Sequence, residues 1–123
     1  MIIGHGVDFI EIDRIQKIFQ SSFKDKFIEK YFKFDLFNKV NPNQLSNNFA
    51  IKEAFSKSLG LGFRAPCFPK DISVQRDKMG KPEIFPKNEL NKYMKEKFGN
   101  FLIHVSLSDT KKYSIASVII EKI

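Results

Sequence analysis

One stretch near the end of the chain alternates apolar and polar residues with a period of two, and a second stretch rich in apolar residues can return beside it. The first, residues 101–108, reads Phe-Leu-Ile-His-Val-Ser-Leu-Ser, and the second covers residues 113–120. Such alternation is typical of strands, in which successive side chains point to opposite faces of a sheet. Because only residues 109–112 separate the two stretches, we expect an antiparallel hairpin, and with it an antiparallel sheet.

The first strand of this hairpin carries His104, Ser106 and Ser108 on one face. A histidine near two serines could indicate a base and a nucleophile. However, neither serine lies in an elbow motif between a strand and a helix, and no third group that would orient the histidine is identifiable. We therefore interpret this face as a source of hydrogen bonds to a ligand or to solvent.

Residues 2–10 predict another strand, in which Gly4, Gly6 and Asp8 share one face. The two glycines leave room beside the carboxylate. Asp8 has two interpretations. It fits the capping-box spacing with Glu11 at the start of a helix, and it also fits one half of a Mg²⁺ site completed by a second carboxylate.

The second carboxylate is Glu53, in the run Phe-Ala-Ile-Lys-Glu-Ala-Phe-Ser-Lys of residues 49–57. We predict a helix over residues 43–59, with Glu53 and Lys57 one turn apart at the edge of the core. A surface ion pair between these two residues is the simpler interpretation of the spacing, and Mg²⁺ ligation with Asp8 is the other. Gly60 suits the left-handed position after a helix, so a C-cap is favoured over a phosphate loop.

The remaining elements are predicted from periodicity and turn residues. Apolar stripes indicate helices around residues 10–19 and 23–32, and a solvent-facing helix over residues 87–98. Residues 71–76 alternate as a strand. A turn at residues 77–82 then leads into residues 83–85, with an unusual backbone conformation at Gly80 and limited strand pairing at Pro82.

A chain of 123 residues fits one domain with a real core. The hydrophobic residues, 42% of the chain, include 14 Phe and no Trp, so we expect a Phe-rich core. Cys67 is the only cysteine, which excludes an internal disulfide and a cysteine-based zinc cluster. Without a basic leader or an apolar run of membrane-spanning length, the sequence predicts a soluble cytoplasmic protein with no membrane partner.

The formal net charge of +7 predicts attraction to an acidic partner. The excess comes mainly from lysine, since Arg14, Arg64 and Arg76 are the only arginines. Nucleic acid is one acidic partner, so a basic nucleic-acid-binding domain without enzymatic activity, using aromatic residues to stack on bases, is an alternative function. That alternative leaves the pairing of Asp8 with Glu53 unexplained.

Four motifs in a fixed order indicate a protein family more specifically than any single one of them does. They are Gly6-Val-Asp8, the run from Phe49 to Gly60, Asp71-Ile-Ser-Val with Gly80-Lys81-Pro82, and His104-Val-Ser-Leu-Ser108. In this order they resemble the holo-[acyl-carrier-protein] synthase family of 4′-phosphopantetheinyl transferases, over nearly the whole chain. The resemblance implies an α+β fold in a single domain of residues 1–123, with a curved antiparallel sheet wrapped around a long helix. It also implies a homotrimer with active sites between subunits.

The resemblance further implies roles for individual residues. Asp8 and Glu53 are expected to hold Mg²⁺ against the diphosphate of coenzyme A, while Lys57 stabilises charge on the transferred group. These three are the expected catalytic residues. The expected contacts to coenzyme A are Lys57, Gly60, Gly62, Gly80, Lys81, Pro82, Asp109 and Thr110.

Two segments depart from the family pattern. The last family motif usually reads Ser-His-Thr, whereas residues 108–110 read Ser-Asp-Thr. Asp109 would repel nucleotide phosphates unless it is turned away, paired with a lysine such as Lys111, or joined to the metal. A family member with weakened catalysis, kept for binding or assembly, is therefore a third hypothesis. The second departure is residues 32–36, where the family commonly shows Phe-Thr-x-x-Glu.

The implied reaction moves 4′-phosphopantetheine from coenzyme A to a serine of apo acyl carrier protein, releases adenosine 3′,5′-bisphosphate and supports fatty acid biosynthesis. Acyl carrier proteins are acidic, which gives the basic charge a partner without nucleic acid. Arg14 and Ile18 on the first helix are the expected carrier contacts, although Ile18 equally fits the core. Glu53, acting through a metal-ordered water, is the first candidate to accept the serine proton, and Asp8 is the second.

Overall fold

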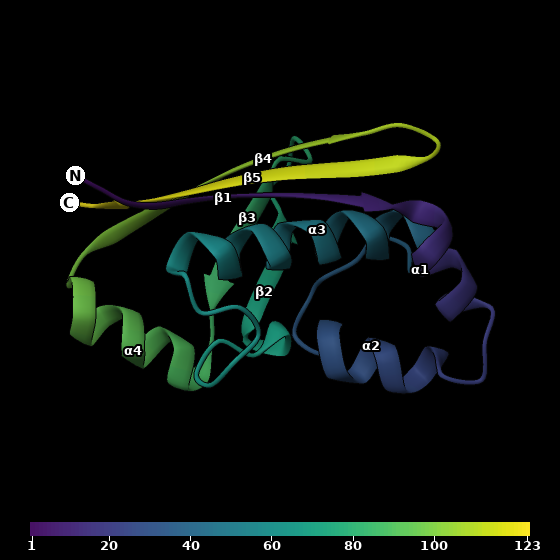
Figure 1. Ribbon diagram of the computed structural model, residues 1–123, viewed down its shortest axis with the longest axis horizontal. Helices are drawn as coiled ribbons and strands as arrows, with labels where there is room; N and C mark the ends of the chain where they lie inside the picture. Colours follow the sequence, from purple (N-terminus) through teal and green to yellow (C-terminus); the bar gives the residue numbers. More distant parts are fainter.

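The computed structural model describes all 123 residues. In chain order its elements are β1 (Ile2–Glu11), α1 (Ile12–Phe19), α2 (Lys24–Phe32), α3 (Pro42–Leu59), the 3₁₀ helix η1 (Pro69–Asp71), β2 (Ile72–Arg76), β3 (Pro82–Pro86), α4 (Asn88–Phe98), β4 (Phe101–Asp109) and β5 (Tyr113–Lys122). Figure 1 shows the long helix α3 lying along one face of the long strands, with α2 and α4 on the far side of α3. This α+β arrangement confirms the expected fold class.

Two antiparallel sheets provide the strands. The larger has the order β1-β5-β4, and the smaller pairs β2 with β3. The predicted hairpin of residues 101–120 is present, and its register places Asp109 opposite Ser114 and Leu107 opposite Ala116. On the other side of β5, Asp8 of β1 also lies opposite Ala116. The hairpin therefore forms two thirds of the sheet that carries Asp8.

The contact between β1 and α3 depends on two glycines. A Cβ atom added to Gly4 would overlap the carbonyl oxygen of Ser58, and one added to Gly6 would overlap the carbonyl oxygen of Ala54. The predicted strand and its glycine face are thus confirmed. The space that the glycines leave is filled by the main chain of α3, which brings Asp8 on β1 close to the surface of this helix.

Local signals at both ends explain the extent of α3. The Asn41 side chain accepts a hydrogen bond of 2.9 Å from the Gln44 N–H, and Pro42 occupies the first turn, where it needs no N–H partner. At the other end Gly60 adopts the left-handed conformation with φ of 74°, as predicted. Between these ends the helix is buried on most sides, as Ala50, Ile51 and Phe55 illustrate.

The core is less rich in Phe than expected. Phe32, Phe49 and Phe55 are its only fully buried phenylalanines, whereas seven isoleucines are buried. Most other phenylalanines pack at the edge of the core, where Phe27 contacts the Phe32 ring at a centroid distance of 5.3 Å. Aliphatic side chains fit better in the narrow space between α3 and the sheet, and the larger rings gather around α2.

Several local predictions differ from the structure. Asp8 is not a helix cap, because β1 continues to Glu11 and α1 begins only at Ile12. Ile10 belongs to β1 rather than to the first helix. Asp71 ends the 3₁₀ helix instead of starting a strand, and Pro82 takes part in pairing, opposite Arg76 at the first position of β3. No helix combines the length and the apolar character that crossing a membrane requires.

Candidate active site

Asp8 occupies the middle of β1 on the face that packs against α3. Its side chain is 15% exposed. Gly6 and Ile10, two residues away on either side, are buried on the same face. The strand therefore presents the carboxylate at the rim of the contact with α3, where it can reach both the helix surface and solvent.

Glu53 lies half-buried on α3, and the charge of Asp8 affects its pKa. Burial raises the pKa of Glu53, and the negative charge of Asp8 raises it further, while Lys57 and Arg14 act in the opposite direction. Two carboxylates from distant parts of the sequence thus lie near each other where β1 runs along α3, since Gly6 packs against Ala54 and Asp8 bonds to Lys57. The expectation that Glu53 lies at the edge of the core and near Asp8 agrees with the structure.

Lys57 binds Asp8 and not Glu53. Its ammonium donates to Asp8 Oδ1 at 3.1 Å and to the carbonyl oxygen of Val7 at 3.2 Å, and its side chain is 53% exposed. The simple ion pair between Glu53 and Lys57 is therefore wrong. By turning to β1 the ammonium gains two acceptors, the Asp8 carboxylate and the Val7 carbonyl oxygen. Turning to Glu53, one helical turn away, would give it only one.

The donor atoms fit a divalent cation that arrives with a substrate. Asp8 and Glu53 provide carboxylate oxygens, and no group of three or more His, Cys, Asp or Glu residues is placed to hold a metal. Mg²⁺ is commonly held by one or two carboxylates together with water and substrate phosphates. The mutual repulsion that contributes to the raised pKa of Glu53 is what such a cation would relieve.

Asp109 is held by α3. The Asn47 amide donates to Asp109 Oδ2 at 2.9 Å, while Asn47 Oδ1 accepts a hydrogen bond from Ser114. Pairing with Lys111, one of the expected ways to offset this carboxylate, does not occur. Asn47 was missed from the sequence. The polar run Ser46-Asn47-Asn48, inside a helix that had to be largely buried, was the signal that could have identified it.

Three of the expected coenzyme A contacts also have local structural roles. Gly60 and Gly62 both have left-handed backbone, with φ of 74° and 65°, and form the exit from α3. The Thr110 hydroxyl accepts hydrogen bonds from the N–H groups of Lys112 and Tyr113 and thereby closes the turn between β4 and β5. The C-cap interpretation of Gly60 is therefore confirmed.

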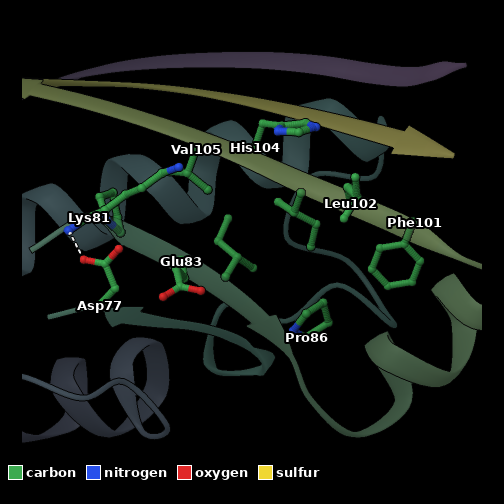
Figure 2. A pocket seen from close by; sticks show the side chains of 11 residues that line it. Asp77, Lys81, Glu83, Pro86, Phe101, Leu102, His104 and Val105 are labelled. Atoms are coloured by element: carbon green, nitrogen blue, oxygen red, sulfur yellow. Dashed lines mark hydrogen bonds between the residues drawn. The ribbon is translucent and has the colours of Figure 1, made fainter. Parts of the chain in front are cut away.

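The turn of residues 77–81 lies away from the carboxylates. Its Asp77 side chain accepts from the N–H groups of Met79 and Lys81, and Gly80 has φ of 87°. Figure 2 shows Lys81 and Asp77 at one end of a groove between β3 and β4, with Phe101 and Pro86 at the other end. This groove has a volume of about 370 Å³.

A second cavity, of about 340 Å³, brings Gly80 and Arg76 next to Gln44 in the first turn of α3. Neither this cavity nor the groove includes Asp8, Glu53 or Lys57. One chain therefore assembles Asp8, Glu53 and Lys57, but it does not join them to Gly80, Lys81 and Pro82 in a common pocket.

The first helix presents the expected carrier contacts on its outer side. Arg14 is exposed, and its guanidinium carbon lies 5.8 Å from the centre of the Phe49 ring. Ile18 is partly exposed and does not belong to the buried core, whereas Phe19 packs against that core. Arg14 and Ile18 are therefore both available on the surface that adjoins Glu53.

Comparison with known proteins gives the chain its family. The model of the 4′-phosphopantetheinyl transferase superfamily matches residues 4–118. The chain belongs to this superfamily. The resemblance derived from the four sequence motifs is thereby confirmed.

Relatives of this transferase superfamily member cover its full length. The holo-[acyl-carrier-protein] synthase of Pelagibacter ubique is 40% identical, with 98% of each chain covered. That of Clostridium botulinum strain Eklund 17B is 43% identical, with 100% of each chain covered.

Solved structures agree with this relationship. The holo-[acyl-carrier-protein] synthase of Neisseria meningitidis has a TM-score of 0.87 and 32% identity, covering 99% of this chain and 100% of that one. The Bacillus anthracis enzyme, solved in complex with coenzyme A (3′,5′-ADP), has a TM-score of 0.77 and 30% identity, covering 100% and 99%.

Proposed function

We propose that this chain transfers 4′-phosphopantetheine from coenzyme A to a serine of an apo acyl carrier protein, and so supports fatty acid biosynthesis. The observation that carries the proposal is the meeting of Asp8 and Glu53 between β1 and α3, in a chain whose relatives are holo-[acyl-carrier-protein] synthases. A nucleic-acid-binding domain has no use for two adjacent carboxylates, which repel phosphates. The transferase reading accounts for both the pair and the +7 charge.

In this reaction the serine oxygen bonds to the phosphorus that carries phosphopantetheine. The bond from that phosphorus to the oxygen bridging the diphosphate breaks, and the oxygen leaves with adenosine 3′,5′-bisphosphate. Glu53 is our candidate to accept the serine proton through an ordered water, because its half-buried carboxylate lies beside Asp8 at the contact between β1 and α3. The Lys57 ammonium, close to both carboxylates, is placed to meet the negative charge of the diphosphate.

Asp8 and Glu53 are the residues that would hold Mg²⁺. When bound, Mg²⁺ would neutralise charge on the diphosphate oxygens. The contribution of the chain is to hold the two carboxylates on separate rigid elements, so that the incoming phosphates are oriented before the reaction begins.

A homotrimer would complete a site that one chain leaves open. Asp8, Glu53 and Lys57 border none of the cavities, whereas Gly80, Lys81 and Pro82 line cavities elsewhere. The outer face of the larger sheet, which turns away from α3, carries exposed apolar side chains that suit contact with another copy: Val7, Phe9, Leu102, Tyr113 and Ile115. Such contact would bring the turn of one subunit to the carboxylates of the next.

Sedimentation measurements test this assembly. Ile115→Glu places a charge on the outer sheet face and is expected to give monomers with little transferase activity. Val40→Glu is the matched control, because Val40 is also an exposed apolar residue but lies outside the sheet and lines no cavity. A wild-type chain that sediments as a monomer while remaining active would contradict the trimer.

The proposed carrier surface on α1 has a separate test. Arg14→Glu is expected to raise the KM for the carrier at least about tenfold, because it replaces attraction to an acidic partner by repulsion, and to leave the KM for coenzyme A nearly unchanged. Lys92→Glu on α4 makes the same charge change at another exposed position. If the two variants raised the KM for the carrier equally, Arg14 would contribute only through the net charge of the protein and not through a specific contact.

The transfer itself is tested by intact-mass spectrometry of an apo acyl carrier protein incubated with the chain, coenzyme A and Mg²⁺. We expect a mass increase of one phosphopantetheine, which EDTA, Asp8→Asn and Glu53→Gln each abolish. The exposed residues Asp25 and Glu89 supply the matched variants Asp25→Asn and Glu89→Gln, which should retain activity. If several folded carriers show no increase, the proposal is wrong.

A further inference from the structure

The Lys57 ammonium is hydrogen-bonded to an Asp8 oxygen that a divalent cation would bind. The ammonium lies 3.1 Å from Asp8 Oδ1 and donates a second hydrogen bond, of 3.2 Å, to the carbonyl oxygen of Val7. The two acceptors are adjacent in β1, so they hold the ammonium from one side. The positive charge that balances Asp8 is thus supplied by the chain itself, one helical turn beyond Glu53.

An ammonium and a divalent cation cannot share this position. Both are attracted to the same carboxylate oxygen, and two positive charges a few ångströms apart repel each other. The lysine must therefore withdraw before a metal can bind Asp8 through Oδ1, the oxygen to which the ammonium is bonded. Because the Lys57 side chain is 53% exposed and its stem is flexible, it can swing toward solvent without disturbing the core.

A lysine that leaves Asp8 needs a new partner, and Glu53 cannot supply one once it too binds the cation. Phosphate oxygens of coenzyme A can be that partner, because they are strong acceptors for an ammonium. We propose that Lys57 is an internal competitor for the cation position at Asp8, which keeps Mg²⁺ binding weak until a diphosphate arrives and draws the ammonium away. This inference rests on the proposed metal site of Asp8 and Glu53, and it predicts that cation and coenzyme A bind cooperatively.

The proposal is tested by calorimetric titration of metal-stripped protein with Mg²⁺ alone, and with Mn²⁺ followed by electron paramagnetic resonance. Lys57→Met keeps the length of the side chain and removes the charge. We expect it to bind the cation about five- to tenfold more tightly than the wild type when coenzyme A is absent. Saturating coenzyme A should remove or reverse this difference, since only the wild type gains a contact from lysine to phosphate.

Lys33→Met is the matched control, because Lys33 is 47% exposed and pairs with a carboxylate at 3.4 Å, but does so on α2. It lowers the net charge equally and should leave cation affinity unchanged. An equal gain in both variants would show a general charge effect and overturn the proposal.

The double variant Asp8→Asn with Lys57→Met should lose the gained affinity. If Lys57→Met binds the cation no better than wild type while Asp8→Asn abolishes binding, the metal site stands and the competition is refuted. If neither Asp8→Asn nor Glu53→Gln changes cation affinity, the metal site itself is wrong and the competition falls with it.

Discussion

The ammonium of Lys52 donates a hydrogen bond of 2.8 Å to the Asp35 carboxylate, and neither side chain has any exposed surface. Lys52 also donates to the carbonyl oxygens of Pro69 and Ile72. Burial lowers the pKa of Lys52 and raises that of Asp35, while the attraction between them opposes both shifts. This one lysine ties α3 to the segment after α2, to η1 and to β2.

Removing one member of that pair should be costly. We expect Asp35→Ala to lower the free energy of unfolding by about 3–5 kcal/mol, because it leaves a buried ammonium without its counter-charge. Asp25→Ala, at an exposed position of α2, should change stability by less than about 0.5 kcal/mol. Guanidinium denaturation measures both. A small effect of Asp35→Ala would mean that the main-chain carbonyls alone satisfy Lys52.

Gly6→Ala should separate β1 from α3. The added methyl group meets the carbonyl oxygen of Ala54, and main-chain atoms in a helix cannot turn aside as a side chain can. We expect a loss of about 3 kcal/mol or more in the free energy of unfolding. Val40→Ala is the control, because Val40 is an exposed valine outside the sheets and helices. Comparable losses in the two variants would contradict the close contact described here.

Asp109→Asn tests whether the unusual carboxylate weakens coenzyme binding. The amide still offers an oxygen to Asn47, so stability should change by less than about 1 kcal/mol. Removing the negative charge should lower the KM for coenzyme A about two- to fivefold if Asp109 lies near its phosphates. An unchanged KM would place Asp109 away from them. A large gain in turnover from Asp109→His would support the hypothesis of weakened catalysis.

The raised pKa of Glu53 gives a pH dependence with a definite sign. An acid whose pKa is higher in the folded chain binds its proton more tightly when folded, so ionisation of this group subtracts from stability. Without cations, Glu53→Gln should therefore be more stable than wild type near pH 7. The difference should shrink as the pH falls through the folded pKa of Glu53, and should vanish below the ordinary glutamate pKa of about 4.3, where Glu53 is protonated in both states. Thermal melts in EDTA measure the stability of wild type and Glu53→Gln as a function of pH. Parallel curves for the two proteins would refute this prediction.

The sequence predicted those features that depend on neighbouring residues. The hairpin of residues 101–120 follows from the alternation in residues 101–108 and the short turn after them, and the end of α3 follows from the conformational freedom of Gly60. The position of Glu53 at the edge of the core follows from helical periodicity. In each case the residues that decide the structure lie within one element or its immediate flank.

Contacts between distant segments could not be predicted in the same way. The spacing rule paired Lys57 with Glu53, since it considers one helix alone, but the actual partner lies 49 positions away in the sequence. Pairing of Asp109 with the nearby Lys111 was one of three alternatives, and the partner in the structure is the distant Asn47. The burial of Lys52 is not predictable from the sequence, because a lysine in a charged motif is ordinarily exposed, and its burial requires acceptors from three separate segments.

The direct contact between the main chains of β1 and α3 has a consequence for how the protein tolerates change. At Gly4 and Gly6 no side chain separates strand from helix, so the spacing of Asp8 from Glu53 is set by two backbones. Exchanges among isoleucine, leucine and phenylalanine elsewhere in the interior can then accumulate without altering that spacing. A redesigned version of the protein would have to keep these two positions glycine, together with the buried pair of Lys52 and Asp35, and could vary the aliphatic interior around them.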